Sequence, residues 1–294
     1  MPGLLSPDEL LLVVGCGFVV GGLSGIFGVG GSFLLVPILH VVLGIPIELA
    51  VGSTACQVLG PSTAALLARR VTRIQLRLPL IITGGIIMGV ILGTIILQAA
   101  GQFGKLQVNG RNVDASELLV LSAYLVMLVG IGSFSLYEVR RQLVGHPVRR
   151  GLLARLSVPP VDTFSELGVG TLSIPVLSMF GFVTGVTAGM LGISGALLLI
   201  PGLVYLLDIR SQKAILASLI VVWITSFLAT ISHAWHGNVD LALTVALMFG
   251  GTIGARIGSD LGTRLQGRSL RSGIGWLSLI AAGLVVFQLF QLLK

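Results

Sequence analysis

Charged residues divide the chain into long apolar runs. Neither Leu10–Ile47 nor Leu167–Leu207 contains Asp, Glu, Lys or Arg. At about 1.5 Å per residue, a straight helix over residues 10–47 would be roughly 57 Å long, whereas the hydrocarbon core of a bilayer is about 30 Å thick. We therefore predict that each long run turns back inside the membrane or crosses it twice.

The remaining apolar runs have the length of single membrane-spanning helices. They are Leu49–Ala68, Leu78–Leu97, Leu118–Tyr137, Ala214–Ser232, Leu241–Leu261 and Gly273–Leu292. The pattern predicts an all-α polytopic membrane protein in which each half is a glycine-broken hairpin followed by three transmembrane helices. Residues 1–138 would form the first membrane repeat, 139–166 a basic cytoplasmic linker and 167–294 the second repeat.

A glycine motif occurs in both long runs. Gly17–Pro37 is repeated at Gly181–Pro201, 164 positions later (181 − 17). The identities are Gly17/Gly181, Phe18/Phe182, Val19/Val183, Gly21/Gly185, Gly25/Gly189, Gly28/Gly192, Gly31/Gly195, Leu34/Leu198, Leu35/Leu199 and Pro37/Pro201. Glycine clusters weaken a helix and expose backbone groups that lipid cannot bind, so protein or water must surround them. Glycine-broken segments at equivalent places in two halves are typical of a transporter's binding site.

The distribution of arginine predicts opposite orientations for the two halves. Arginines are concentrated in Arg69–Arg77 and in Arg140–Arg155, whereas His233–Asp240, the loop equivalent to the first of these, has no Lys or Arg. Cytoplasmic loops are enriched in Lys and Arg, so both arginine-rich segments should be cytoplasmic. His233–Asp240, Gly101–Glu117 and both termini should then be external, and the two halves would form an inverted-topology repeat.

The composition places the chain among membrane proteins. Hydrophobic residues make up 54% and charged residues 10% of the sequence, whereas soluble proteins carry roughly 25% charged residues. The net charge of +7 accords with arginines in short connections, so we expect the lipid bilayer and not nucleic acid as the partner. Cys16 and Cys56 both lie in apolar runs, which predicts no disulfide framework.

The two glycine turns are the first candidate binding site. Their residues are Gly28, Gly30, Gly31 and Ser32 in the first half and Gly192, Ser194 and Gly195 in the second. A helix that starts at such a turn presents unpaired N–H groups and its positive dipole end, which favours an anion without a buried cation. The alternative is that these glycines only permit close packing of helices.

Hydroxyl and amide side chains in the following helices are the second candidate. Thr54 aligns with Ser218 at the same offset (218 − 54 = 164), and Gln57 lies one turn from Thr54. Such neutral groups could bind sulfonate, sulfite or carboxylate oxygens at membrane depth, or could bond back to the preceding helical turn. For Ser62 and Ser226, which align in the same way, we expect the back-bonded state.

Few ionisable or reactive side chains lie within the apolar runs. His40 is the one candidate for an intramembrane proton carrier, and an interface histidine is the stronger interpretation. We therefore favour transport without a Na⁺ or proton site built from Asp or Glu. Cys56 is expected to be a small buried hydrophobe. The sequence lacks zinc-protease, Walker and haem-attachment motifs, so we expect no enzyme activity, metal site or cofactor.

With the doubled glycine motif, the proline after it and the helix starts Ala50–Thr54 and Ala214–Leu219, the chain resembles the sulfite exporter TauE/SafE family, also called the toluene sulfonate uptake permease family. The resemblance covers nearly the whole chain and implies membrane transport of small anions, chiefly sulfite, sulfonates and other organosulfur compounds. The positions that match the family's motifs are Gly28, Gly31, Gly192, Gly195, Thr54 and Ser218. Ser53-Thr54-Ala55 departs from the usual Thr-Ser-Leu, and Gln57 occupies a usually apolar position.

The predicted function is that of a permease or exporter of small organosulfur anions in the inner (plasma) membrane. It would work by alternating access around a midplane site between the inverted halves. The alternatives are an anion channel, a carboxylate transporter, or a membrane sulfur-transfer protein that uses Cys56. A small anion is the expected partner, and a homodimer is one assembly that the chain could form.

Overall fold

The computed structural model describes residues 7–27, 32–67, 76–108, 111–144, 151, 153–154, 156, 158–164, 170–193, 195–209, 211–262 and 267–293. The helices are α1 (Pro7–Phe27), α2 (Ser32–Val41), α3 (Ile47–Gln57), α4 (Leu59–Leu67), α5 (Arg77–Gln102), α6 (Ala115–Leu143), α7 (Ile174–Leu191), α8 (Ala196–Pro201), the π-helical segment η3 (Gly202–Leu206), α9 (Ser211–Trp235), α10 (Leu241–Gly262) and α11 (Gly267–Leu293). The strands are β1 (Lys105–Val108), β2 (Arg111–Asp114), β3 (Val161–Thr163) and β4 (Thr171–Ser173).

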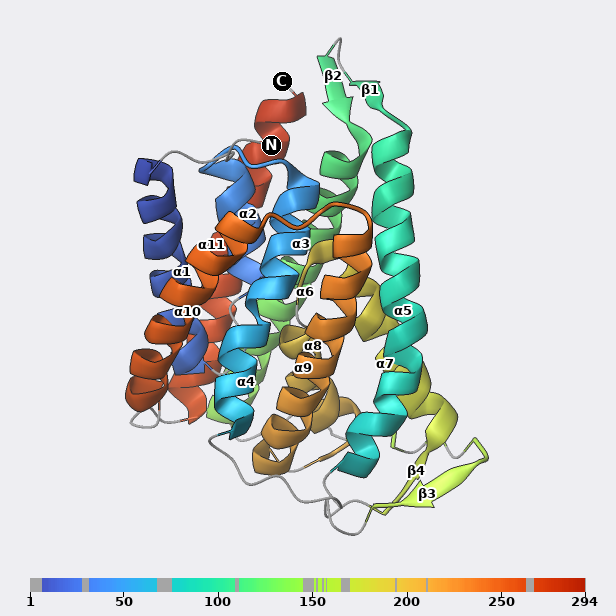
Figure 1. Ribbon diagram of the computed structural model, residues 1–294. Coiled ribbons are helices and arrows are strands. Elements are labelled where there is room, and N and C mark those ends of the chain that lie inside the picture. Colours follow the sequence, from blue (N-terminus) through green and yellow to red (C-terminus); the bar gives the residue numbers. More distant parts are fainter. Residues whose placement is uncertain are drawn as a thin grey trace.

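Long apolar helices dominate the described part of the chain (Figure 1). Seven of them are long and apolar enough to cross a membrane, namely α1, α5, α6, α7, α9, α10 and α11. The protein is therefore an all-α polytopic membrane protein. Both long apolar runs are broken near the predicted turns, because α1 gives way to the short helix α2 and α7 gives way to α8 and η3.

Two features of the fold differ from the predicted elements. The apolar run Leu49–Ala68 predicts one helix, but the structure divides it into α3 and α4 at Val58. Pro61 accounts for this break, because proline has no N–H for the carbonyl of Gln57 and its ring clashes with that carbonyl. In the second half Thr225 stands at the equivalent position (61 + 164), and α9 continues unbroken. Two short antiparallel hairpins, β1–β2 and β3–β4, were also not predicted.

The elements of the two halves begin at opposite ends of the molecule. Both termini and the β1–β2 hairpin lie at the upper end of Figure 1, and the β3–β4 hairpin lies at the lower end. Helix α1 begins near the upper end, whereas α7 begins at the lower end beside β4. Helix α4 ends and α5 begins at the lower end, whereas α9 ends and α10 begins at the upper end.

Glycines join α1 to α10 and α5 to α7. On α1 they are Gly17, Gly21 and Gly25; on α10, Gly250, Gly254 and Gly258; on α5, Gly85, Gly89 and Gly93; and on α7, Gly181, Gly185 and Gly189. A Cβ added at Gly21 would lie 2.6 Å from Gly251 Cα, and one at Gly185 would lie 2.6 Å from the carbonyl oxygen of Ile86. Both are closer than real Cβ contacts, so the helix backbones touch, as glycines four residues apart permit in membrane bundles.

We call the glycine-lined contacts α1–α10 and α5–α7 the two glycine seams. They give the first part of the repeated motif, which lies in α1 and α7, a role different from that of the glycine turns that follow it. Gly17, Gly21 and Gly25 and their equivalents in α7 are packing residues, as the packing interpretation states for the motif as a whole. Each seam also joins a helix of the first half to a helix of the second. Helices α6 and α11 add a third such contact, through the Glu138–Arg271 ion pair and a 2.7 Å hydrogen bond from Ser135 Oγ to the carbonyl of Arg271.

Candidate functional site

The second glycine turn is described by Gly192, Ile193 and Gly195. Gly192 and Gly195 have φ angles of 66° and 76°, a backbone conformation that favours glycine. A Cβ at Gly192 would overlap the carbonyl oxygen of Val51 and would lie 2.9 Å from Val51 Cα. The hydroxyl of Tyr124 donates to the carbonyl of Leu191 at 2.8 Å. The turn is thus held against α3 of the first half and tied to α6.

Four predicted site residues lie outside the described residues, namely Gly28, Gly30, Gly31 and Ser194. Ser32, the first residue of α2, is buried with 1% of its surface exposed. A Cβ at Gly195 would meet Thr184 Cγ2 at 2.7 Å, so this glycine faces a side chain of α7 and not the backbone of another helix. The glycine part of the predicted site therefore stays a prediction in both halves.

Polar groups without partners are buried on α3 and α9. Thr54 Oγ1, Gln57 Oε1 and Ser226 Oγ are buried and have no hydrogen-bond partner among the described residues. Most buried polar atoms in proteins are paired, so unpaired ones indicate water, an ion or a ligand. The back-bonding expected for Ser226 is wrong, whereas Ser62 Oγ does donate to the carbonyl of Val58 at 2.7 Å.

Thr54 and Ser218, which are equivalent in sequence, are in different surroundings. Thr54 is completely buried, whereas Ser218 donates to the carbonyl of Ile215 at 2.9 Å and lines a cavity. The amide nitrogen of Gln57 lies against Gly251 of α10, where an added Cβ would overlap it. Among the predicted site residues that the structure describes, only Ser218 lines this cavity.

The cavity has a volume of about 500 Å³ and lies between α1, α4, α9 and α10; we call it the lower cavity. Its polar lining consists of Ser24, Ser62, Ser218, Thr252, Arg256, Ser259 and Asp260. Arg256, Ser259 and Asp260 are exposed on α10, towards the lower end of the molecule. The cavity extends inward to Val58 and Val222, which are equivalent positions of the two halves (58 + 164). The lining thus combines one cation with one carboxylate and several hydroxyl groups, of which those of Ser62, Ser218 and Ser259 donate to backbone carbonyls three or four residues earlier. Arg256 and the hydroxyl groups could bind a small anion.

Sequence reasoning missed most of this lining. Ser24 lies inside the repeated glycine motif, one residue before Gly25, and Arg256 lies inside the glycine segment of α10. The available signal was a polar residue within the glycine segment of each helix of the α1–α10 pair. This signal was hard to recognise, because Ser24 and Arg256 lie on helices far apart in the sequence and no motif spacing connects them.

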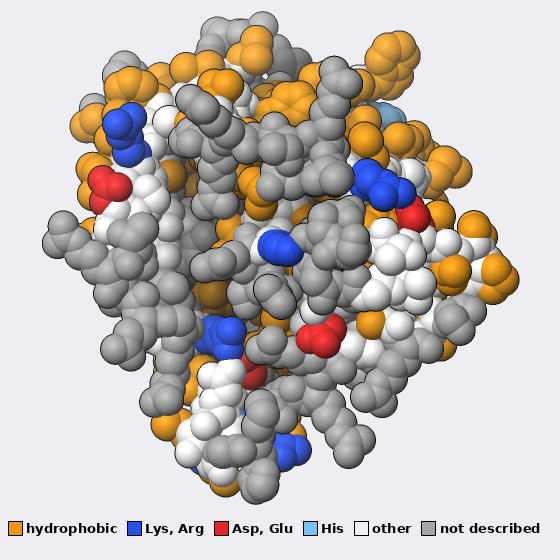
Figure 2. All heavy atoms as spheres, turned by 90° about the horizontal axis from the view of Figure 1, so that it is seen from below, with side chains coloured by type: hydrophobic (Ala, Val, Ile, Leu, Met, Phe, Trp, Pro, Cys, Tyr) orange, Lys and Arg blue, Asp and Glu red, His pale blue; other side chains and the backbone are white. Residues whose placement is uncertain are grey.

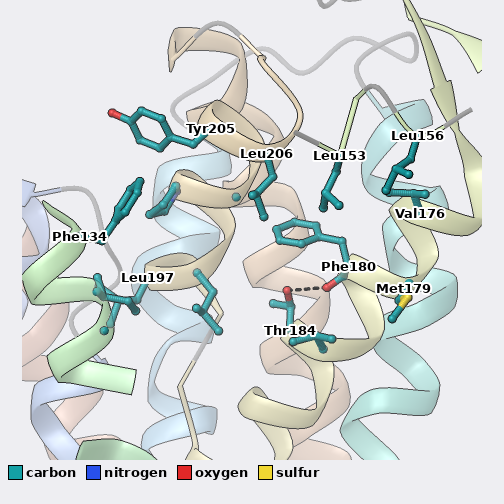
Figure 3. A pocket seen from close by; sticks show the side chains of 16 residues that line it. Phe134, Leu153, Leu156, Val176, Met179, Phe180, Thr184, Leu197, Tyr205 and Leu206 are labelled. Atoms are coloured by element: carbon teal, nitrogen blue, oxygen red, sulfur yellow. Dashed lines mark hydrogen bonds between the residues drawn. The ribbon is translucent and has the colours of Figure 1, made fainter. Parts of the chain in front are cut away.

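A second cavity, of about 490 Å³, is apolar and lies among α6, α7, α8, η3 and the linker (Figure 3). Figure 3 shows Phe134, Phe180, Leu197 and Leu206 around it, and Phe134 packs edge to face with Tyr205 at 5.3 Å between ring centroids. Thr184 also lines this cavity, and its hydroxyl donates to the carbonyl oxygen of Phe180 at 2.8 Å. With no charged lining residue, this cavity is unsuited to an anion.

Seven helices of membrane-spanning length and composition define a multi-pass membrane protein. Residues 13–285 match the model of the family described as Sulfite exporter TauE/SafE. The chain therefore belongs to this family.

Relatives with similar sequences have transporter names. A probable membrane transporter protein of Xylella fastidiosa (strain 9a5c) is 26% identical over 264 residues, which cover 89% of this chain and 88% of that protein. The probable membrane transporter protein YjnA of Bacillus subtilis (strain 168) is 29% identical over 262 residues, covering 87% of this chain and 91% of YjnA. No solved structure matches the chain. The family and these names indicate a membrane transporter rather than an enzyme.

Proposed function

We propose that the protein is a carrier of small organosulfur anions, such as sulfite or sulfonates, and that the lower cavity is its cytoplasmic access to the substrate site. The observation that carries this proposal is the position of Arg256 and the hydroxyls of Ser24 and Ser218 in one cavity lined by both halves. Family membership supports the class of substrate.

Charge at the two ends of the bundle supports a cytoplasmic location for the lower end. Viewed from below, the molecule presents Lys and Arg side chains, with Asp and Glu side chains among them (Figure 2). Described basic residues at the lower helix ends are Arg77, Arg140, Arg141, Lys213, Arg256 and Arg271. Described acids at the upper end are Glu9, Glu48, Asp114, Glu117 and Asp240. The positive-inside rule then makes the lower end cytoplasmic.

Two observations support an inverted repeat. Helices α1 and α7 begin at opposite ends of the molecule, and each glycine seam joins a helix of one half to a helix of the other. The lower cavity is lined by Ser24 and Ser218, and the equivalents of these residues, Ala188 and Thr54, are 1% and 0% exposed. Ser218 is itself only 3% exposed, so the difference between the two halves is the cavity that lies beside Ser24 and Ser218. In an alternating-access carrier this is an inward-open state, and its outward-open counterpart would expose Thr54.

Counterflow in proteoliposomes tests the proposal and separates a carrier from an anion channel. Vesicles preloaded with sulfite, thiosulfate, taurine, sulfoacetate, lactate or sulfate are diluted into the labelled anion, and a carrier should accelerate uptake for its own substrates only. Arg256→Gln should raise the half-saturation concentration about tenfold by removing one charge-assisted contact. Arg141→Gln, at the same end but outside the cavity, is the matched control. Absence of counterflow with every anion would reject the carrier.

A further inference from the structure

His40 and Glu117 form a partly buried ion pair near the upper end of the bundle. His40 lies in the last turn of α2 and Glu117 in the first turn of α6, and their side chains are 12% and 14% exposed. The Nε2 atom of His40 is 2.7 Å from Glu117 Oε1, and its Nδ1 atom is 2.8 Å from the carbonyl oxygen of Ile45. Gln288 of α11 donates to the same carboxylate oxygen at 3.4 Å. Three helices thus meet at one carboxylate.

The chemistry of the partners fixes the number of protons in this pair. A carbonyl oxygen can only accept, so Nδ1 of His40 must carry a proton. A 2.7 Å contact between Nε2 and a carboxyl oxygen requires a second proton between them, on either atom. If this second proton is lost, a nitrogen lone pair faces a carboxylate, and the contact becomes repulsive. The link between α2 and α6 therefore depends on one bound proton.

The surroundings of the pair favour the protonated state. Glu48 of α3 is within electrostatic reach of the ring. Glu9 of α1 and Asp240 line a small hollow next to Ile45, and α11 contributes the amide of Gln288. Burial of the ring opposes its positive charge, whereas the contacts with Glu117 and the carbonyl of Ile45 and the negative charge of Glu48 stabilise it.

The second half of the chain has no equivalent of this pair. The position related to His40 by the repeat is Val204 (40 + 164), a buried residue of η3. A titratable link is thus present in the hairpin of the first half and is replaced by an apolar residue in the hairpin of the second. Protons from the upper side can therefore bind to the hairpin of the first half. The equivalent position in the hairpin of the second half has no group that binds a proton.

We propose that His40 and Glu117 form a proton-binding site, loaded from the outer side, whose proton holds α2 against α6 and thereby controls the movement of the first hairpin during transport. The proposal takes up the alternative that His40 carries a proton, and it departs from the prediction of transport without a proton site built from Asp or Glu. The proton comes from external water and returns to it when the pair opens. The part of this proposal that concerns transport rests on the proposed function. The proton-dependent link between α2 and α6 does not, because it can be measured without a substrate.

The first test is thermal unfolding of the purified protein in detergent from about pH 5 to about pH 9. The bound proton stabilises the folded wild type, so the unfolding temperature should fall by about 2–4 °C as rising pH removes it. In Glu117→Gln the amide can donate to a neutral His40 at every pH, and this step should disappear. His40→Gln should also lack the step. Asp114→Asn, which removes an exposed acid three residues before Glu117, should keep it.

The second test measures counterflow of labelled sulfoacetate at different external pH values. The pH profile of the wild type should be flattened in Glu117→Gln and retained in Asp114→Asn. Equal pH dependence of unfolding in the wild type and in both pair variants would overturn the proton site. A wild type that shows the unfolding step but no counterflow with any anion would reject the transport function and leave the proton site in place.

Discussion

Substitution of Gly192 by alanine is the sharpest test of how the second glycine turn is held. The residue has a φ of 66°, and alanine in this left-handed conformation costs about 1–2 kcal/mol. The new Cβ would also overlap the carbonyl of Val51 and lie 2.9 Å from Val51 Cα. Overpacking of this kind typically costs about 1–3 kcal/mol, which gives a total of roughly 2–5 kcal/mol.

The assay is thermal unfolding of the purified protein, followed by transport of whichever anion the wild type accepts. At roughly 2–4 °C per kcal/mol, Gly192→Ala should lower the unfolding temperature by about 4–20 °C. Gly195→Ala has the same backbone cost, but its obstacle is the Thr184 methyl group. A side chain can move, so the loss should be smaller.

Gly15→Ala and Gly283→Ala are the matched controls, because a Cβ at either position meets nothing within 4 Å. Both glycines lie inside helices, where alanine is favoured by up to about 1 kcal/mol, so these variants should be as stable as the wild type or more stable. If Gly192→Ala unfolded at the wild-type temperature, the close packing of the turn against α3 would be refuted.

The remaining predictions concern the substrate groups and the topology. Thr54→Val and Ser218→Ala should each raise the half-saturation concentration about tenfold or more, because a bound anion loses one hydrogen bond; unchanged values in labelled uptake at matched expression would remove both residues from the site. In a background without Cys16 and Cys56, a thiol reagent that cannot cross the membrane should label His236→Cys from outside and Arg73→Cys from inside, and labelling of both from one side would reject the inverted repeat.

The helical architecture could be predicted because burial in lipid acts on long stretches of sequence. In lipid the backbone groups of an uncharged run must form hydrogen bonds within the run, which favours a helix. The thickness of the bilayer then sets how many residues such a helix or hairpin needs. The break at Val58 was also readable in principle, since Pro61 removes the donor for the carbonyl of Gln57, four residues earlier. The β1–β2 hairpin was not, because it lies in a polar connection where membrane depth imposes no pattern. Strand β4 lies inside the apolar run Leu167–Leu207, and the absence of charge alone does not distinguish a strand from a helix.

The candidate site was only partly predictable, because it depends on contacts between the two halves. Repeat alignment pairs Thr54 with Ser218, which suggests that they share one site. In the structure Ser218 lines the lower cavity with Ser24 of the first half, and Thr54 lies three residues after Val51, against which Gly192 of the second half packs. Glu117 was assigned to an external loop, and nothing in its local sequence indicates a partner 77 residues away.

The two glycine seams limit which helices of the proposed carrier could move relative to each other. In both seams the backbones of neighbouring helices touch, so α1 cannot slide along α10, nor α5 along α7, without overlap. If the protein works by alternating access as proposed, the rigid bodies would be the pair α1 and α10 and the pair α5 and α7, each drawn from both sequence halves. Motion would then occur where these pairs meet α3, α4 and α9. Thr54 and Gln57 of α3 and Ser226 of α9, which have side-chain oxygens without partners among the described residues, would lie where the bundle opens.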